Sequence, residues 1–246
     1  MASSPFLLRI LSKPVDGNVE AWSEWYTSEG LPSLLTKIPA SRACFYHAYN
    51  DFELKTKTPL EGNQTQLHSV ELAHSDLEPP NDKTCLAMCQ LDSIGSLQEI
   101  FSLSDLTRDD PSHDTVSDIR VYELIEDFDP KGISHVLPPF ILNVQNEPAD
   151  ADDYNKFYHE EHLHMLNRVP GYRRSQRYEL IKGHDDSSSE APRFMAVHEW
   201  DHFDALDGPE LREADASPNT HRVFGNAKRV NIRGFKSVKG FGDVKE

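Results

Sequence analysis

The chain has 246 residues, enough for one large domain or for two small domains with a modest core each. Acidic residues outnumber basic ones by 41 to 25 and the formal net charge is −16. A surface of that charge repels phosphate backbones and anionic membranes, so we expect no nucleic-acid partner and no membrane partner.

The N-terminal run carries Arg9 inside a short apolar stretch, with no charged segment before it. This pattern predicts neither a signal peptide nor a membrane span. The chain has three cysteines, an odd number. Without an export signal they predict reduced thiols and a cytoplasmic protein.

Two parts of the chain follow the same order of residues. A strand-like run, a proline, an aspartate and an aromatic helix follow Pro5, and the same order follows Pro139. Agreement in four blocks in the same order predicts an internal duplication, with repeats over 1–130 and 131–246. The matched blocks are Phe6–Asp16 with Phe140–Asp150, Trp22–Leu31 with Tyr154–Leu163, Leu86–Asp92 with Met195–Asp201, and Ile119–Tyr122 with Ile232–Phe235.

Each repeat is predicted to run strand, helix, strand, strand, helix, strand. The dipeptides Gly208-Pro209 and Ser217-Pro218 are expected to break the last helix of the second repeat. In that repeat we expect strands near 139–146, 172–181, 193–200 and 229–238, and helices near 151–168 and 202–226. Loops are expected near 75–83, 183–192 and 126–136, and the last of these holds the domain boundary.

The segment Phe157–Leu163, followed by Val169–Tyr172, resembles the EthD-like branch of the dimeric α/β-barrel superfamily. In that branch an aromatic-Tyr-x-x-x-His stretch precedes a Pro-Gly turn. His164 stands where these proteins usually have proline. The resemblance implies an α+β fold in which two ferredoxin-like βαββαβ repeats form an intramolecular dimeric α/β barrel, with the helices outside. Such fused barrels are expected to be able to associate further as homo-oligomers.

Three residues of the second repeat are candidates for proton transfer. His198 shares a strand face with Trp200, and if that face meets the helices His198 approaches His162 and Tyr158. Imidazole suits proton abstraction next to a carbonyl, and a tyrosine hydroxyl can stabilise the developing enolate. We expect His162 as base or acid, His198 as its counterpart and Tyr158 as oxyanion donor. The alternative is two hydrogen-bonded core histidines and a packed tyrosine.

Four further residues are predicted to contact the substrate: Phe157, Asn143, Arg177 and Trp200. Arg177, with Arg174, is a candidate for holding a carboxylate, the alternative being solvated side chains on a sheet edge. In the first repeat Gly30 and Cys89 match His162 and His198, so this repeat is less equipped for proton transfer. Cys85 and Cys89 share a strand face and are expected to pack there.

The dense cluster His159–His164 matches neither of the zinc motifs H-E-x-x-H and H-x-x-E-H. We therefore expect no metal and no other cofactor. The predicted function is a cofactor-independent lyase, cyclase or isomerase acting on a small hydrophobic oxygenated molecule, such as an aromatic polyketide or lactone. Two alternatives stay open: a cofactor-free monooxygenase, and a non-catalytic small-molecule-binding or stress-related module.

Overall fold

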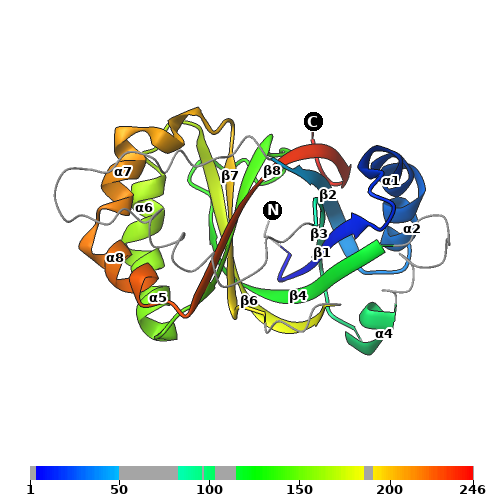
Figure 1. Cartoon of the computed structure of the whole chain (residues 1–246), viewed down its shortest axis with the longest axis horizontal. Helices are drawn as coiled ribbons and strands as arrows, with labels where there is room; N and C mark the ends of the chain where they lie inside the picture. Colours follow the sequence, from blue (N-terminus) through cyan, green and yellow to red (C-terminus); the bar gives the residue numbers. More distant parts are fainter. Residues whose placement is uncertain (1–3, 50–82, 96, 103–114, 186–190, 246) are drawn as a thin grey trace.

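Eight antiparallel strands close into one barrel in the order β1-β3-β2-β8-β5-β7-β6-β4, with the helices outside it (Figure 1). The structure is a computed structural model that describes residues 4–49, 83–95, 97–102, 115–185 and 191–245. The strands are β1 (Phe6–Pro14), β2 (Ala40–Ala48), β3 (Cys85–Leu91), β4 (Thr115–Phe128), β5 (Phe140–Glu147), β6 (Tyr172–Asp185), β7 (Phe194–Trp200) and β8 (Arg229–Gly242).

The helices form two groups on opposite sides of the barrel (Figure 1). The first group comprises α1 (Val19–Trp25), the π-helical turn η1 (Tyr26–Gly30), α2 (Leu31–Leu35) and α4 (Leu97–Ser102). The second comprises α5 (Ala151–Phe157), the π-helical turn η4 (Tyr158–His162), α6 (Leu163–Leu166), the 3-10 turn η5 (Asp204–Asp207), α7 (Pro209–Asp215) and α8 (Pro218–Gly225). The predicted strands and helices of the second half are confirmed, including the breaks before Pro209 and Pro218.

The two halves of the chain have the same strand order. It is β4-β1-β3-β2 in the first half and β8-β5-β7-β6 in the second. Two seams, β2 with β8 and β4 with β6, join the halves and leave the described sheet without an open edge. The expected barrel with outer helices is therefore confirmed.

Three apolar layers follow from this closure. The barrel interior is filled by a core to which all eight strands contribute, and Tyr178 of β6 and Phe235 of β8 are among its largest members. The outer face of the first half packs against Trp22 and Tyr26, and the outer face of the second half packs against Tyr154. Alternation along each strand thus divides its side chains between interior and helix layer.

The helix that carries the predicted site has clear sequence signals at both ends. Asp150 caps it by accepting hydrogen bonds from the backbone N–H groups of Asp152 and Asp153, both at 3.0 Å. At the exit Gly171 adopts φ +82°, a conformation that glycine takes without a steric cost. The predicted helix 151–168 is confirmed at these ends, but a π-helical turn interrupts it at Tyr158–His162.

The predicted loop at 126–136 is wrong at its start, because β4 continues to Phe128 and pairs with β6. The register shifts between Leu124 and Glu126, so Ile125 is an extra residue in the ladder. A bulge of this kind reverses the facing of the residues that follow it. The predicted loop at 183–192 begins later, since β6 runs to Asp185. The predicted loop at 75–83 lies outside the described residues except for its last position.

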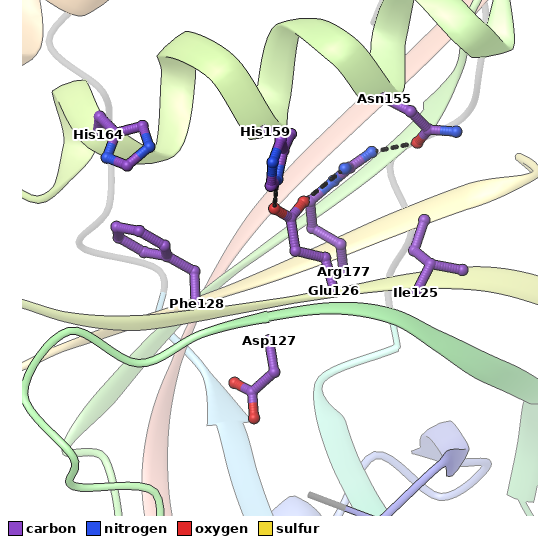
Figure 2. Close-up of a pocket in the computed structure, with 8 residues that line it drawn as sticks. All are labelled: Ile125, Glu126, Asp127, Phe128, Asn155, His159, His164 and Arg177. Atoms are coloured by element: carbon purple, nitrogen blue, oxygen red, sulfur yellow. Dashed lines mark hydrogen bonds and ion pairs between the residues drawn. The ribbon is translucent and has the colours of Figure 1, made fainter.

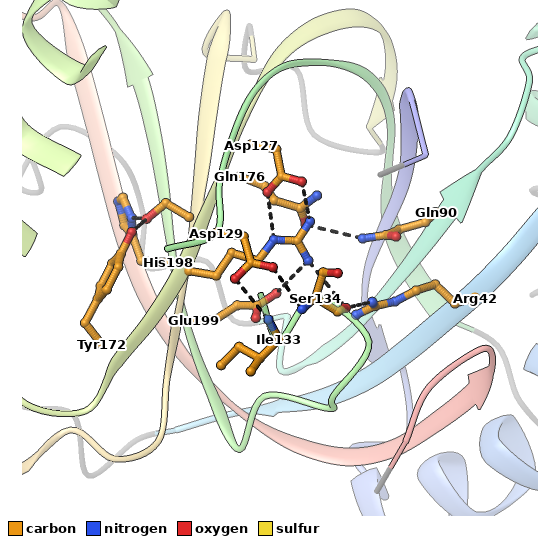
Figure 3. Close-up of polar contacts among 12 residues, drawn as sticks. Arg42, Gln90, Asp127, Asp129, Ile133, Ser134, Tyr172, Gln176, His198 and Glu199 are labelled. Atoms are coloured by element: carbon orange, nitrogen blue, oxygen red, sulfur yellow. Dashed lines mark hydrogen bonds and ion pairs between the residues drawn. The ribbon is translucent and has the colours of Figure 1, made fainter. Parts of the chain in front are cut away.

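A network of polar groups joins several strands of the barrel to the connection between β4 and β5 (Figure 3). Arg174 binds both carboxylate oxygens of Asp127, at 2.7 and 2.8 Å. Arg42 from the first half and Arg174 from the second half both donate to the backbone carbonyl of Ser134. The connection between β4 and β5, which contains the predicted domain boundary, is thereby fixed to both halves. Glu199 is buried beside Arg174, and burial raises its pKa to about 7.

This raised pKa predicts how stability depends on pH. A folded state that raises the pKa of Glu199 from 4.5 to about 7 binds a proton more tightly than the unfolded state. The stabilisation is therefore present at low pH and is lost as pH rises through 7. Glu199→Gln removes the titration, so we expect wild type to lose on the order of 3 kcal/mol relative to the variant between pH 4.5 and 8. Urea unfolding across this range measures it, and parallel curves would contradict the assignment.

Candidate functional site

The structure brings the three predicted catalytic residues together between the second helix group and the sheet. Ring centroids are 5.0 Å apart for Tyr158 and His162, 6.2 Å for Tyr158 and His198, and 6.4 Å for the two histidines. The condition that His198 faces the helices is therefore met. All three side chains are buried. We call these three residues the histidine cluster.

The π-helical turn η4 contains two members of this cluster, Tyr158 and His162. A π-helical turn contains one residue more than an α-helical turn, and such turns often occur at functional sites. The turn is held from outside by Glu161, which accepts hydrogen bonds from Ser217 and Asn219 at the start of α8. Glu161 therefore ties this turn to the start of α8.

A chain of hydroxyl groups orients His198. Its Nδ1 lies 2.6 Å from the Ser175 hydroxyl, which lies 2.7 Å from the Tyr172 hydroxyl (Figure 3). The Tyr158 hydroxyl and His162 Nδ1, by contrast, are buried without a hydrogen-bond partner of normal geometry among the described residues. Buried polar atoms usually have a partner. The hydroxyl of Tyr26, which matches Tyr158 in the first half, also has no such partner among the described residues, so this feature alone does not distinguish the cluster.

Both histidines are neutral at physiological pH. Burial lowers the pKa of His162 to about 3, with a further contribution from the Arg177 guanidinium. Burial lowers the pKa of His198 to about 3 as well, followed by the effects of His162 and Arg177. Burial also raises the pKa of Tyr158 well above its usual value. The sequence predicts an imidazole whose pKa lies close to neutral pH, and neither histidine has such a pKa here. An anion bound alongside would raise both histidine pKa values.

Arg177 is the charged residue closest to this cluster. Its guanidinium carbon lies 4.3 Å from the ring centroid of Tyr158 and 5.0 Å from that of Tyr154. It also donates hydrogen bonds to Glu126, at 2.8 Å, and to Asn155. Only 3% of its side chain is exposed. The alternative of a solvated arginine on a sheet edge is wrong, because β6 is paired on both sides.

A groove of about 620 Å³ opens between this helix and the neighbouring strands (Figure 2). Glu126 spans its floor, with one carboxylate oxygen 2.8 Å from His159 Nδ1 and the other 2.8 Å from Arg177. Asp127 lies on the opposite side of β4 from Glu126, as the alternation of side chains along a strand requires (Figure 2). The lining residues are Ile125, Glu126, Asp127, Phe128, Asn155, His159, His164 and Arg177.

Arg177 links the groove to the histidine cluster, because it lines the first and contacts the second. The cluster residues themselves do not line the groove. Of the other predicted contacts, Phe157 joins the cluster with its ring 5.0 Å from His162. Trp200 packs farther along the helix layer, against Tyr172 at 5.3 Å. Asn143 shares the strand face of Ile141 and therefore points into the barrel interior.

Four residues of this region were missed by sequence reasoning: Glu126, Asn155, Tyr172 and Ser175. The sequence pattern places Glu126 in a loop, and the bulge that turns it toward Arg177 has no sequence signal. His159 and His164 were recognised only as metal candidates. Among the described residues no group of three or more His, Cys, Asp or Glu is arranged to hold a metal ion.

The first half lacks this polar set. In the ladders, His198 lies opposite Ser175 and Leu142, whereas Cys89 lies opposite Ala43 and Leu8. The corresponding π-helical turn ends at Gly30, where an added Cβ would lie 3.0 Å from the ring of Tyr26. The prediction that Cys85 and Cys89 pack in the core is confirmed, and all three cysteines are free and buried.

Comparison with solved structures shows that the fold is shared at very low sequence identity. An anthrone oxidase-like protein matches with a TM-score of 0.61 and 12% identity, covering 99% of this chain and 97% of that chain. A dye-decolorizing peroxidase from Bacteroides thetaiotaomicron matches with a TM-score of 0.51 and 11% identity, covering 96% and 94%. No protein-family model and no curated protein matches the sequence. The chain therefore has the dimeric α+β-barrel fold of these proteins.

No helix in the part of the chain that the structure describes is long and apolar enough to cross a membrane.

The buried histidines predict sensitivity to acid. Because the folded state lowers each histidine pKa from 6.5 to about 3, the unfolded state binds protons more readily below pH 6.5. Stability is then lost as pH falls, by about 2 kcal/mol per histidine between pH 7 and 5. We expect His198→Cys, which introduces the residue of the first half, to remove about half of this dependence.

Chemical denaturation at several pH values measures the effect, with the surface variant His202→Gln as a control for the loss of one histidine. An unchanged dependence in His198→Cys would show that His198 is not held neutral in the folded protein.

Proposed function

We propose that this protein is a cofactor-independent enzyme that removes a proton from a small, weakly acidic, oxygenated aromatic molecule bound in the groove. The observation that carries the proposal is the position of Arg177. A nearly buried guanidinium forms one wall of the groove and lies against the ring of Tyr158. Such a cation favours formation of a phenolate or enolate oxygen in the groove.

The chemical step divides between the groove and the histidine cluster. A substrate oxygen takes its place beside Arg177, whose guanidinium turns toward it and away from the Tyr158 ring. His162 and His198 then accept and return the proton, because an anion near them raises their pKa. Tyr158 donates a hydrogen bond to the same oxygen in place of its contact with the Tyr154 hydroxyl. Phe128, which lines the groove, contacts the aromatic ring.

The carbanion formed in this step has two fates. In the first it adds O₂, and protonation gives a hydroperoxide that loses water. A CH₂ group thus becomes a carbonyl that keeps one oxygen atom of O₂, and the other oxygen atom leaves as water. In the second it rearranges, cyclises or eliminates without consuming oxygen, as a lyase, cyclase or isomerase would require. The name of the anthrone oxidase-like structure supports the first fate, a cofactor-free monooxygenase.

We further propose that the chain is a fusion of two EthD-like repeats, 1–130 and 131–246, of which the second carries the site. The equal strand order and a π-helical turn in the first helical segment of each half support the duplication. The replacement of His198 and Ser175 by Cys89 and Ala43 supports a single site.

A binding module without catalysis is the second candidate. The observation that favours it is the burial of both histidines, which keeps them neutral and away from the groove in the unliganded protein.

The test uses 1,8-dihydroxyanthrone as a probe, with oxygen uptake and the absorbance of the quinone followed against the rate in buffer. We expect wild type to accelerate quinone formation, and Arg177→Gln to lose at least about tenfold of that acceleration through loss of a charged anion contact. Arg193→Gln is the matched control, because Arg193 lies immediately before β7 and forms an exposed ion pair with Glu179 of β6. We expect it to retain the wild-type rate.

Each other outcome identifies a different function. Conversion without oxygen uptake would support the lyase, cyclase or isomerase. Binding of the probe with no conversion, equally strong in His162→Ala, would support the binding module. Absence of both binding and conversion would contradict the groove as a site for hydroxylated aromatic molecules.

A further inference from the structure

The groove contains a histidine and carboxylate pair that the buried cluster does not use. His159 Nδ1 lies 2.8 Å from an oxygen of Glu126. The side chain of His159 is 77% exposed, whereas that of Glu126 is only 17% exposed and is held on its other oxygen by Arg177. The carboxylate is thus fixed, and the imidazole attached to it faces the groove and the solvent (Figure 2).

We propose that His159, oriented by Glu126, is the residue that takes the substrate's proton in the groove and passes it to solvent. This inference rests on the proposed function, since it concerns the same bound molecule. It moves the first proton acceptor from the buried histidines to an exposed one. His162 and His198 then interact with the bound anion from the side of Arg177 that faces away from the groove.

The tautomer of His159 favours this role. An ionised carboxylate only accepts hydrogen bonds, so its partner Nδ1 carries the hydrogen and Nε2 keeps its lone pair free for a proton. When Nε2 accepts that proton, the positive imidazolium remains beside the negative Glu126. A carboxylate that orients and stabilises an imidazolium in this way is a recurring part of histidine base catalysis.

The charges in the groove also balance during the step. Before reaction Glu126 lies between two groups, His159 and the cationic Arg177. After the proton moves, the substrate oxygen is negative and faces Arg177, while His159 is positive and faces Glu126. Each new charge therefore forms next to an opposite charge that is already in place, which lowers the cost of separating them.

The other histidine of the groove has a different environment. The ring of His164 packs edge-on against Phe128, with centroids 5.2 Å apart. His164 therefore contributes to the apolar end of the groove, and His159 is the groove histidine that contacts the Glu126 carboxylate.

The first arm of the test needs no substrate. Diethyl pyrocarbonate modifies neutral imidazole nitrogens, and peptide mass spectrometry reports the rate at each histidine. At pH 8 we expect Glu126→Gln to slow modification of His159 by about tenfold or more, because the ring loses the partner that fixes its tautomer. The rate at His202 serves as internal reference, and Glu160→Gln is the matched control, since Glu160 lies next to His159 but contacts Lys156. An equal rate at His159 in wild type and Glu126→Gln would overturn the proposal.

The second arm measures turnover of 1,8-dihydroxyanthrone against pH. We expect His159→Gln to lose at least about tenfold in rate and the acidic limb of the pH profile, and Glu126→Asp to recover part of the loss of Glu126→Gln. Wild-type turnover that His159→Gln retains in full, with the same pH profile, would overturn the proposal and leave the proposed function intact. If wild type does not turn over the probe, the proposed function fails for this molecule, and the modification rates alone decide whether His159 is an activated base.

Discussion

The pairing of β4 with β6 is the constraint on which the site depends. This seam closes the barrel on one side and removes the edge that would otherwise expose Arg177. It also carries the bulge at Ile125, which turns Glu126 toward the helix layer. The ion pair between Glu126 and Arg177 is therefore a product of barrel closure. A barrel without the extra residue would direct this carboxylate into its interior.

Burial has opposite effects on the two parts of the site. Beneath the helix, burial shields the hydroxyl and imidazole groups of the histidine cluster from solvent. Both histidines are neutral there, because burial lowers their pKa values. At the groove the charges of Arg177 and Glu126 are retained, because the two side chains lie within hydrogen-bonding distance of each other. The arrangement places the neutral, preorganised histidine cluster next to the charged side chains of the groove. Electrostatic stabilisation of a developing anion is strongest in such a setting, since no solvent has to reorient.

Much of the fold was accessible from sequence because hydrophobic periodicity and turn residues are local signals. The strands of the second half and the helix that ends before Gly171 follow from these signals. The meeting of His162, His198 and Tyr158 followed from strand alternation and held because no slip occurs in β7. The groove could not be predicted in the same way. It depends on a bulge and on the pairing of strands far apart in the chain, and neither leaves a local pattern.

The seam between β4 and β6 also affects which amino-acid substitutions the protein can accept. In a symmetric dimer of identical subunits every substitution occurs at both seams, so each change must suit two interfaces at once. Here both seams belong to one chain, and they have different residues. Glu126 reaches the groove from a strand of the first half, although that half has Cys89 and Gly30 in place of the histidines. One half is thus free to serve as structural support and to lend a side chain to the other, a division of labour that a symmetric pair does not permit.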